Sequence, residues 1–256
     1  LSRSKIEYVL NPDGSPGYHW GIFTGCEQPL SVCATRPTCW ARLGHHRFGK
    51  TGWSKLYNPD FSLKFNEHLL DEPFKLRKPS TIAVAFTADM FGPGSEWHYI
   101  SVVLETVKLC PQQKFLFLTK SPQNLSAFNP WPPNAWVGCT ITGAETAYRQ
   151  AEMIQDLSNV HGASIHWLSY EPTLGPLTCN LKDIDWLVIG AQSGAKAQKP
   201  ARHWPVNAAL EAGRLGIPIW EKNNLAKMLG KPLLQQLPLS PQLPKRQELP
   251  YETQNH

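Results

Sequence analysis

The sequence predicts an α/β fold, with six to seven parallel strands arranged as a partial or closed TIM-like (β/α) barrel. Short and nearly continuous apolar runs recur along the chain, with helical patterns between them. Apolar runs of this kind suit strands that are buried on both faces of a parallel sheet. The chain has 256 residues, and for this length we prefer a barrel to an open, doubly wound sheet.

The predicted strands follow one another from residue 18 to residue 222. In chain order they read YHWGIFTG (18–25), TIAVAFTA (81–88), KFLFLTK (114–120), AWVGCTIT (135–142), SIHWLSYE (164–171), DWLVIGAQS (185–193) and IPIWEK (217–222). Helices are predicted between them at 39–48, 62–70, 96–109, 145–158 and 204–215. The last helix is expected to stop at Gly216, because glycine commonly follows a helix C-terminus.

The alternation indicates one domain over residues 1–229. The proline-rich segment 230–256 cannot form a long helix or a central strand. We expect it to be either an ordered strap over the barrel or a loose tail.

Composition indicates a globular protein, since 18% of the residues are charged and ten are tryptophan. No apolar run approaches the roughly 18 residues that span a bilayer, and the first residues do not resemble a signal peptide. We therefore expect a cytoplasmic protein with no membrane partner. The net charge of +5 permits an anionic substrate or nucleic acid without requiring one.

Three cysteines, Cys26, Cys33 and Cys39, follow the first predicted strand in the segment GCEQPLSVCATRPTCW. A disulfide would use two of them and is disfavoured in the cytosol, and a nucleophile would need only one. Three thiolates suit a [4Fe–4S] cluster with one iron open, or zinc with a fourth ligand such as His45 or His46. The loose C-x6-C-x5-C spacing favours the cluster over zinc and over unrelated free thiols.

Polar or small residues end nearly every predicted strand. In parallel α/β folds the functional site lies at the carboxyl ends of the strands, so these residues are expected to meet at one polar mouth. The relevant endings are Thr24-Gly25-Cys26, Thr87-Ala88-Asp89, Thr119-Lys120, Thr140-Ile141-Thr142, Ser169-Tyr170-Glu171 and Gln192-Ser193-Gly194.

With its three-cysteine loop after the first strand, the chain resembles the radical S-adenosylmethionine superfamily. It is most similar to a phage-associated family of unknown function (DUF5131). The similarity runs over about residues 5–240 and includes EPFKLRKP (72–79), WLSYEPTLGPL (167–177) and IDWLVIGAQSG (184–194). The chain departs from that family in the wider spacing of its last two cysteines, and in having Gln192 where the family has glutamate.

The resemblance implies an enzyme that uses a [4Fe–4S] cluster to cleave S-adenosylmethionine. The resulting 5′-deoxyadenosyl radical would take a hydrogen atom from the substrate. The three cysteines would hold the cluster and form the catalytic centre, and an electron donor such as flavodoxin or ferredoxin would reduce it. A nucleotide or nucleic acid is the substrate class that we expect.

The resemblance also implies cofactor-binding roles for several residues near the strand ends. Asp89 would bind the ammonium group of S-adenosylmethionine with support from Thr87. Thr140 and Thr142 would bind the ribose, and Ser169 and Glu171 the cofactor or substrate. Gly190 would let the backbone approach the adenine, on which Trp40 would pack.

Structural roles remain open for the same residues. Asp89 is also suited to a helix N-cap, Glu171 to an ion pair with a lysine, and Trp40 to the core. The alternatives for the whole protein are a non-catalytic zinc-binding or nucleic-acid-binding barrel, and a hydrolase that uses Asp89 and Glu171 as acid and base.

Overall fold

The computed structural model describes residues 1–48, 55–194 and 197–239. In this part of the chain the main element is an eight-stranded sheet of order β1-β2-β5-β6-β7-β8-β9-β10. From β2 to β10 all neighbouring strands are parallel, and β1 pairs with β2 in the antiparallel sense. The strands are β1 (Ser2–Arg3), β2 (Tyr18–Trp20), β5 (Thr81–Val84), β6 (Lys114–Thr119), β7 (Ala135–Thr140), β8 (Ile165–Tyr170), β9 (Trp186–Ile189) and β10 (Ile219–Glu221). The predicted α/β class is confirmed.

Across the sheet, the parallel strands follow their order in the sequence, without the reversal of strand order that defines a doubly wound sheet. The sheet is not a closed barrel. Within the described residues, β1 and β10 are its two edges and do not pair with each other. The closed form of the predicted barrel is therefore wrong for this chain.

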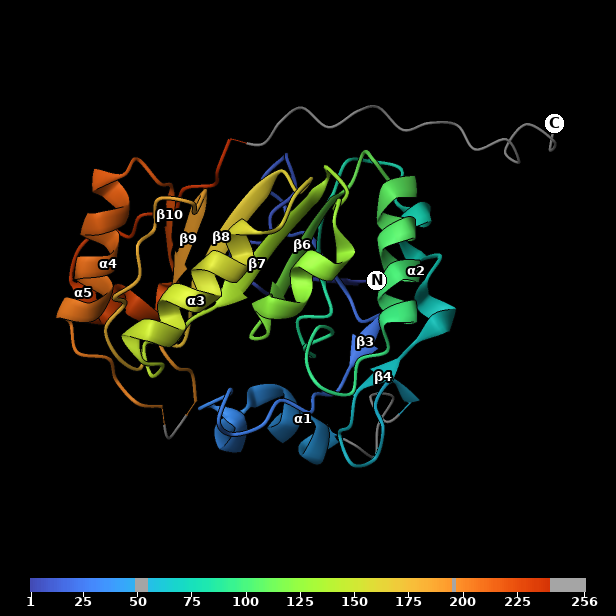
Figure 1. Ribbon diagram of the computed structural model, residues 1–256, viewed down its shortest axis with the longest axis horizontal. Helices are drawn as coiled ribbons and strands as arrows, with labels where there is room; N and C mark the ends of the chain where they lie inside the picture. Colours follow the sequence, from blue (N-terminus) through green and yellow to red (C-terminus); the bar gives the residue numbers. More distant parts are fainter. Residues whose placement is uncertain (49–54, 195–196, 240–256) are drawn as a thin grey trace.

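Five α-helices lie in the described residues, namely α1 (Trp40–Phe48), α2 (Trp97–Leu109), α3 (Ala147–Ser158), α4 (His203–Arg214) and α5 (Ala226–Leu229). The first four agree with predicted helices, and Gly216 follows α4 with a φ of +72°. Figure 1 shows α2, α3 and α4 spread along one face of the sheet, whereas α1 lies across one end of it. None of the described helices is long and apolar enough to cross a membrane.

The helix predicted at 62–70 is wrong. This segment contains the short strand β4 (Lys64–Phe65), which pairs with β3 (Phe23–Thr24), and then a 3-10 turn at Glu67–Leu69. The Asn66 side chain lies between the two and donates hydrogen bonds to the Gly21 carbonyl oxygen at 3.0 Å and to Thr24 Oγ1 at 3.2 Å. These tertiary contacts outweigh the weak helical pattern of a short segment.

The sheet is buried on both faces, which explains why its strands read as continuous apolar runs. One face packs against the helices through side chains such as Val103 of α2 and Leu157 of α3. The other face holds a cluster of aromatic rings covered by the N-terminal segment, where Tyr8 contacts Trp167 and Trp186 edge-on at centroid distances of 5.9 and 5.5 Å.

The chain beyond α5 runs along the outer edge of β10. The Glu221 N–H donates to the Leu234 carbonyl at 2.6 Å, and the Gln236 N–H donates to the Ile219 carbonyl at 2.8 Å. Lys231 forms an ion pair with the buried Glu221 at 2.7 Å. Residues 230–239 thus form a strap on this edge, and the rest of the predicted tail, 240–256, lies outside the described residues.

Candidate functional site

The three cysteines lie on a single segment, residues 25–39, which we call the cysteine loop and which leads from β3 to α1. All three thiols are free and partly buried. The loop begins at Gly25, which has a φ of +77° and forms a parallel bridge with Ala88 just beyond β5. A Cβ on Gly25 would lie 2.1 Å from the Ser62 carbonyl oxygen, so only glycine fits at this position.

Gln28 attaches the cysteine loop to the ends of β5 and β6. Its side chain is buried, and its Nε2 donates to Asp89 Oδ2 at 2.8 Å and to Ser121 Oγ at 2.6 Å. The loop Gly92–Gly94 closes over it, and a Cβ on Gly92 would lie only 2.6 Å from Gln28 Nε2. The fold therefore fixes the loop directly after its first cysteine.

The Asp89 carboxylate is buried and accepts four hydrogen bonds. Its Oδ1 accepts from Thr119 Oγ1 at 2.6 Å and from the Phe91 N–H at 3.3 Å. Its Oδ2 accepts from the Lys120 N–H at 2.8 Å as well as from Gln28. The nearest following α-helix, α2, begins only at Trp97, so the N-cap alternative for Asp89 is wrong. Asp89 instead joins the cysteine loop to the ends of β5 and β6.

A second side chain holds the other end of the cysteine loop. Gln192, which follows β9, donates from Nε2 to Thr38 Oγ1 at 2.9 Å, directly before Cys39. Its Oε1 accepts from the Gln198 N–H at 2.8 Å. Together with Gly25 and Gln28, this contact stretches the loop across the carboxyl ends of β5, β6 and β9.

Burial governs the acidity of the first of the three thiols, that of Cys26. The pKa of Cys26 is raised to about 11, mainly by burial, with smaller upward contributions from the charges of Asp89, Cys33 and Cys39. Burial also raises the pKa of Tyr57. Tyr57 belongs to a small apolar cluster with Ala41 and Phe61, against which Cys26 and Cys39 pack. The Thr87 hydroxyl is buried and has no hydrogen-bond partner among the described residues.

The donor set fits a cluster with one open iron, because three free thiols lie on one loop. Among the described residues, however, no three His, Cys, Asp or Glu side chains are grouped so as to hold a metal ion. His45 is buried against the rings of Tyr57 and Phe61, and His46 is exposed.

Hydroxyl side chains lie at the ends of the central strands. Thr140 and Ser169 are buried neighbours in the register of β7 and β8. Thr142 is engaged locally, since its N–H and its Oγ1 both donate to the Glu145 carboxylate, at 3.0 Å in each case. The structure thus brings Thr140 and Ser169 together, whereas Thr142 is occupied by Glu145.

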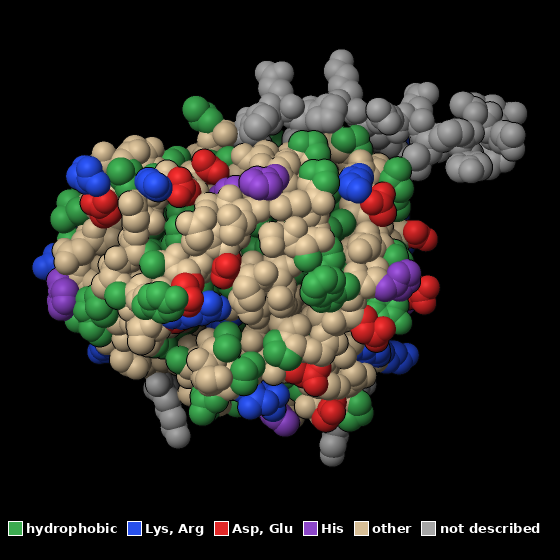
Figure 2. All heavy atoms as spheres, viewed as in Figure 1, with side chains coloured by type: hydrophobic (Ala, Val, Ile, Leu, Met, Phe, Trp, Pro, Cys, Tyr) green, Lys and Arg blue, Asp and Glu red, His purple; other side chains and the backbone are tan. Residues whose placement is uncertain are grey.

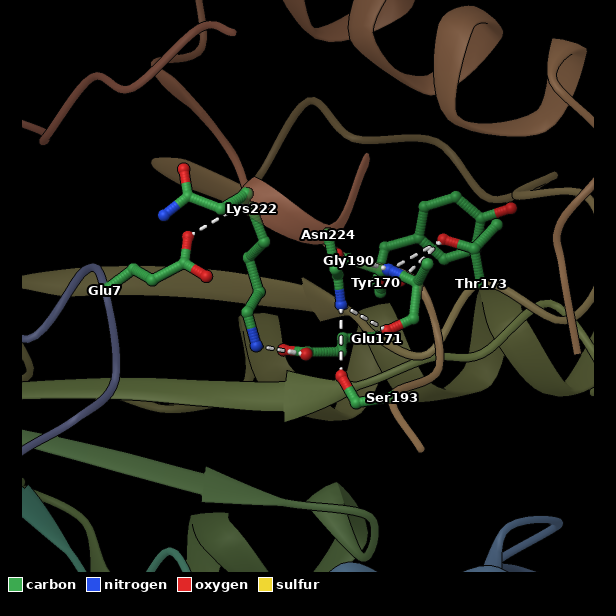
Figure 3. A network of polar contacts seen from close by, with 10 residues as sticks. Glu7, Tyr170, Glu171, Thr173, Gly190, Ser193, Lys222 and Asn224 are labelled. Atoms are coloured by element: carbon green, nitrogen blue, oxygen red, sulfur yellow. Dashed lines mark hydrogen bonds and ion pairs between the residues drawn. The ribbon is translucent and has the colours of Figure 1, made fainter. Parts of the chain in front are cut away.

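Glu171 forms an ion pair with Lys222, between the ends of β8 and β10 (Figure 3). Gly190, at the end of β9, lies against this pair, and a Cβ there would be 2.8 Å from Lys222 Cδ and 3.0 Å from Glu171 Cδ. Gly190 was expected to make room for an adenine, but the ion pair fills the space beside it. The structure therefore shows the alternative role for Glu171, an ion pair with a lysine.

Trp40 is the first residue of α1 and is 62% exposed, so the core alternative for it is wrong. Leu43, one turn further along the helix, is also exposed. On the face that Figure 2 shows, lysine and arginine side chains are interspersed with aspartate and glutamate. The exposed Trp40 lies on the helix that the cysteine loop enters.

The site that emerges combines predicted and unpredicted residues. The cysteines, Asp89, Thr140 and Ser169 lie at the carboxyl ends of the sheet, as expected. Gln28 and Ser121 were missed, and so was the contact between Gln192 and Thr38, because single amides and hydroxyls in loops carry no motif signal.

Comparison with known proteins gives one match. The sequence profile of the protein family of unknown function DUF5131 matches residues 3–224. No curated protein and no solved structure matches the chain. The matched range includes the cysteine loop, the parallel sheet from β2 to β10 and the pair of Glu171 with Lys222. The chain therefore belongs to the DUF5131 family.

Proposed function

We propose that this protein is a radical S-adenosylmethionine enzyme whose cysteine loop holds a [4Fe–4S] cluster at the carboxyl ends of the sheet. The observation that carries the proposal is the attachment of one loop with three free thiols to the ends of β5, β6 and β9. The consecutive strand order supports a partial barrel of the radical S-adenosylmethionine type.

Such a cluster, once bound and reduced, supplies the electron that cleaves S-adenosylmethionine to methionine and a radical that abstracts hydrogen from the substrate. The protein contributes binding, orientation and exclusion of water. Cys26, Cys33 and Cys39 are the ligands. In this proposal Thr140 and Ser169 hydrogen-bond the cofactor. Glu171, which is paired with Lys222, exchanges that partner for a charged group of the cofactor or substrate.

We further propose that the substrate is a nucleotide or nucleic acid. Trp40 offers an exposed aromatic face next to the cysteine loop, and Arg36 is exposed within that loop. An exposed aromatic ring and an exposed guanidinium four residues apart in the chain suit base stacking together with phosphate contact. The reducing partner is an electron donor such as flavodoxin or ferredoxin.

The test is anaerobic reconstitution with iron and sulfide, followed by incubation with dithionite and S-adenosylmethionine. Wild type is expected to absorb broadly near 400 nm and to yield 5′-deoxyadenosine. A Cys26/Cys33/Cys39→Ala triple variant is expected to do neither, whereas the control Cys179→Ala, outside the loop, keeps both. A colourless wild type that binds zinc and yields no 5′-deoxyadenosine would contradict the proposal and support the zinc-binding alternative.

A further inference from the structure

Two segments at the carboxyl ends of the strands contain basic residues and no acidic ones. Residues 28–48, which include most of the cysteine loop and all of α1, contain three arginines and neither aspartate nor glutamate. Residues 186–210, which include β9 and the start of α4, contain two lysines and one arginine and likewise lack acidic residues. The chain as a whole has 20 acidic against 25 basic side chains. Positive charge is therefore concentrated in these two segments.

The side chain of Gln192 joins the two basic segments. Its Nε2 donates to Thr38 Oγ1 at 2.9 Å, and its Oε1 accepts from the Gln198 N–H at 2.8 Å. Arg36 lies two residues before Thr38 in the chain, and Lys199 directly follows Gln198. Figure 1 shows the connection between β9 and α4 beside the cysteine loop. The basic residues of the two segments are therefore neighbours across this contact.

Three of these cations have no counter-ion within the described part of the chain. None of its ion pairs includes Arg36, Arg47 or Lys199, and all three side chains are exposed. Elsewhere, Arg149 and Arg214 each pair with a glutamate three residues away on the same helix. Exposed cations that no carboxylate neutralises attract an anionic partner.

An aromatic ring is exposed next to these cations. Trp40 and Leu43 are 62% and 54% exposed. Trp40, Leu43 and Arg47 follow one another at spacings of three and four residues in α1, so they share one face of the helix. Arg42 has a different environment, with its guanidinium 5.2 Å from the centroid of the Phe61 ring. Exposed aromatic rings among cations are the features with which proteins bind single-stranded nucleic acids, through base stacking and phosphate contact.

We propose that an unpaired nucleic acid strand lies across these two segments, with a base stacked on Trp40 and phosphates contacted by Arg36, Arg47 and Lys199. Several unpaired cations on two segments favour a strand over a free nucleotide, because a strand offers a series of phosphates. The exposed ring favours unpaired bases, since the faces of paired bases are covered by their neighbours in a duplex. This inference rests on the proposed function, whose substrate class it narrows to a single strand. It also adds the segment between β9 and α4 to the binding surface.

The test measures how binding depends on salt. A fluorescent single-stranded DNA of about ten nucleotides is titrated with anaerobically reconstituted protein at several salt concentrations, and its anisotropy is followed. Each phosphate contact to a single strand contributes about 0.7 to the slope of log affinity against log salt concentration. Arg36→Ala and Lys199→Ala are each expected to reduce the magnitude of the slope by about 0.7, and the double variant by about 1.4. A duplex of the same sequence is expected to compete about tenfold less well, the loss that accompanies one stacked base.

Lys182→Ala is the matched control, because Lys182 is an exposed lysine before the amino end of β9 and outside both segments. It is expected to leave the slope unchanged. A wild-type slope in both Arg36→Ala and Lys199→Ala, an equal reduction in Lys182→Ala, or tighter binding of the duplex would each contradict the inference. If the oligonucleotide does not bind but polyglutamate does, and that binding requires Lys199, the surface takes an acidic protein and the inference is wrong.

The outcomes separate the inference from the proposed function. If the slope depends on Arg36 and Lys199 in a protein that makes no 5′-deoxyadenosine, the strand-binding surface stands and the proposed radical chemistry does not. If the protein makes 5′-deoxyadenosine but binds no oligonucleotide, the radical chemistry stands and the inference is wrong.

Discussion

Gln192 donates a hydrogen bond of 2.9 Å to the hydroxyl of Thr38, although 154 residues separate the two in the sequence. The contact joins the end of β9 to the residue directly before Cys39. The two ends of the cysteine loop thus depend on strands from opposite halves of the sheet.

Replacing Gln192 with leucine is expected to expose Cys39. A hydrogen bond of this kind contributes about 0.5–1.5 kcal/mol, so its loss increases the open fraction of the loop by up to about tenfold. The rate of iodoacetamide modification of Cys39, followed by peptide mass spectrometry, is expected to rise accordingly. Gln192→Glu keeps the acceptor for the Gln198 N–H but lacks the N–H that donates to Thr38, whose own hydroxyl hydrogen is given to the Thr35 carbonyl. This variant is therefore also expected to react faster than wild type. Equal rates in wild type and Gln192→Leu would show that the contact does not hold the loop.

Gly190→Ala is expected to destabilise the fold by about 1–3 kcal/mol, because its methyl group would overlap Lys222 and displace the ion pair with Glu171. Urea unfolding measures the effect. Gly213→Ala is the control, since that glycine lies in α4 with no atom within 4 Å of an added Cβ. It is expected to leave stability unchanged or raise it by up to about 1 kcal/mol. A Gly190→Ala variant as stable as wild type would mean that the pair moves aside at little cost.

Cys26 is expected to react slowly with alkylating reagents below pH 9, because the thiolate is the nucleophile and the pKa of this thiol is about 11. Its modification rate in the folded protein is expected to rise about tenfold per pH unit up to about pH 11. For protein unfolded in urea, the pH at which the modification rate is half-maximal is expected near 9.0, the ordinary pKa of a cysteine thiol. A midpoint near 9 in the folded protein would contradict the prediction.

The raised pKa of Cys26 also makes the stability of the fold depend on pH. Since the unfolded chain loses the Cys26 proton first, the free energy of unfolding is expected to fall as the pH rises from about 9 to about 11. A Cys26→Ala variant is expected to lose this part of the pH dependence, which urea unfolding at the two pH values would detect.

Trp40→Ala is expected to weaken the binding of a single-stranded oligonucleotide by about 1–3 kcal/mol, the loss that accompanies removal of one stacking ring. Fluorescence anisotropy of a labelled oligonucleotide measures this. Trp97→Ala is the control, because Trp97 is a comparably exposed ring (56%) at the start of α2, outside the cysteine loop and α1. Equal affinities in wild type and Trp40→Ala would argue against nucleic acid as the substrate.

The parallel strands were predictable because burial on both faces leaves an unmistakable pattern in the sequence. The apolar run 135–142 became β7 (Ala135–Thr140), with Cys139 buried inside it. The first run, 18–25, was predicted as one strand but divides into β2 and β3, because Trp20 pairs with β5 whereas Phe23 pairs with Phe65 of β4. Pairing partners so distant in the sequence leave no trace in a local window.

The candidate site was predictable only in part. Cysteine spacing and the rule for strand ends located the thiols and Asp89, since both signals are local. Whether a side chain is free or occupied depends on neighbours that only the fold supplies. Glu171 pairs with Lys222, which follows β10 and is 51 residues further along the chain. Trp40 is exposed on a helix that also carries the buried Ala41 and His45.

The strap on β10 has a consequence for the association of this protein with other chains. An exposed strand edge is a template on which foreign strands add and aggregates grow. Residues 234–236 already form hydrogen bonds with the outer edge of β10. They therefore prevent a strand of another chain from pairing with this edge. A chain that ends before residue 230 would keep every candidate site residue but is expected to be less soluble.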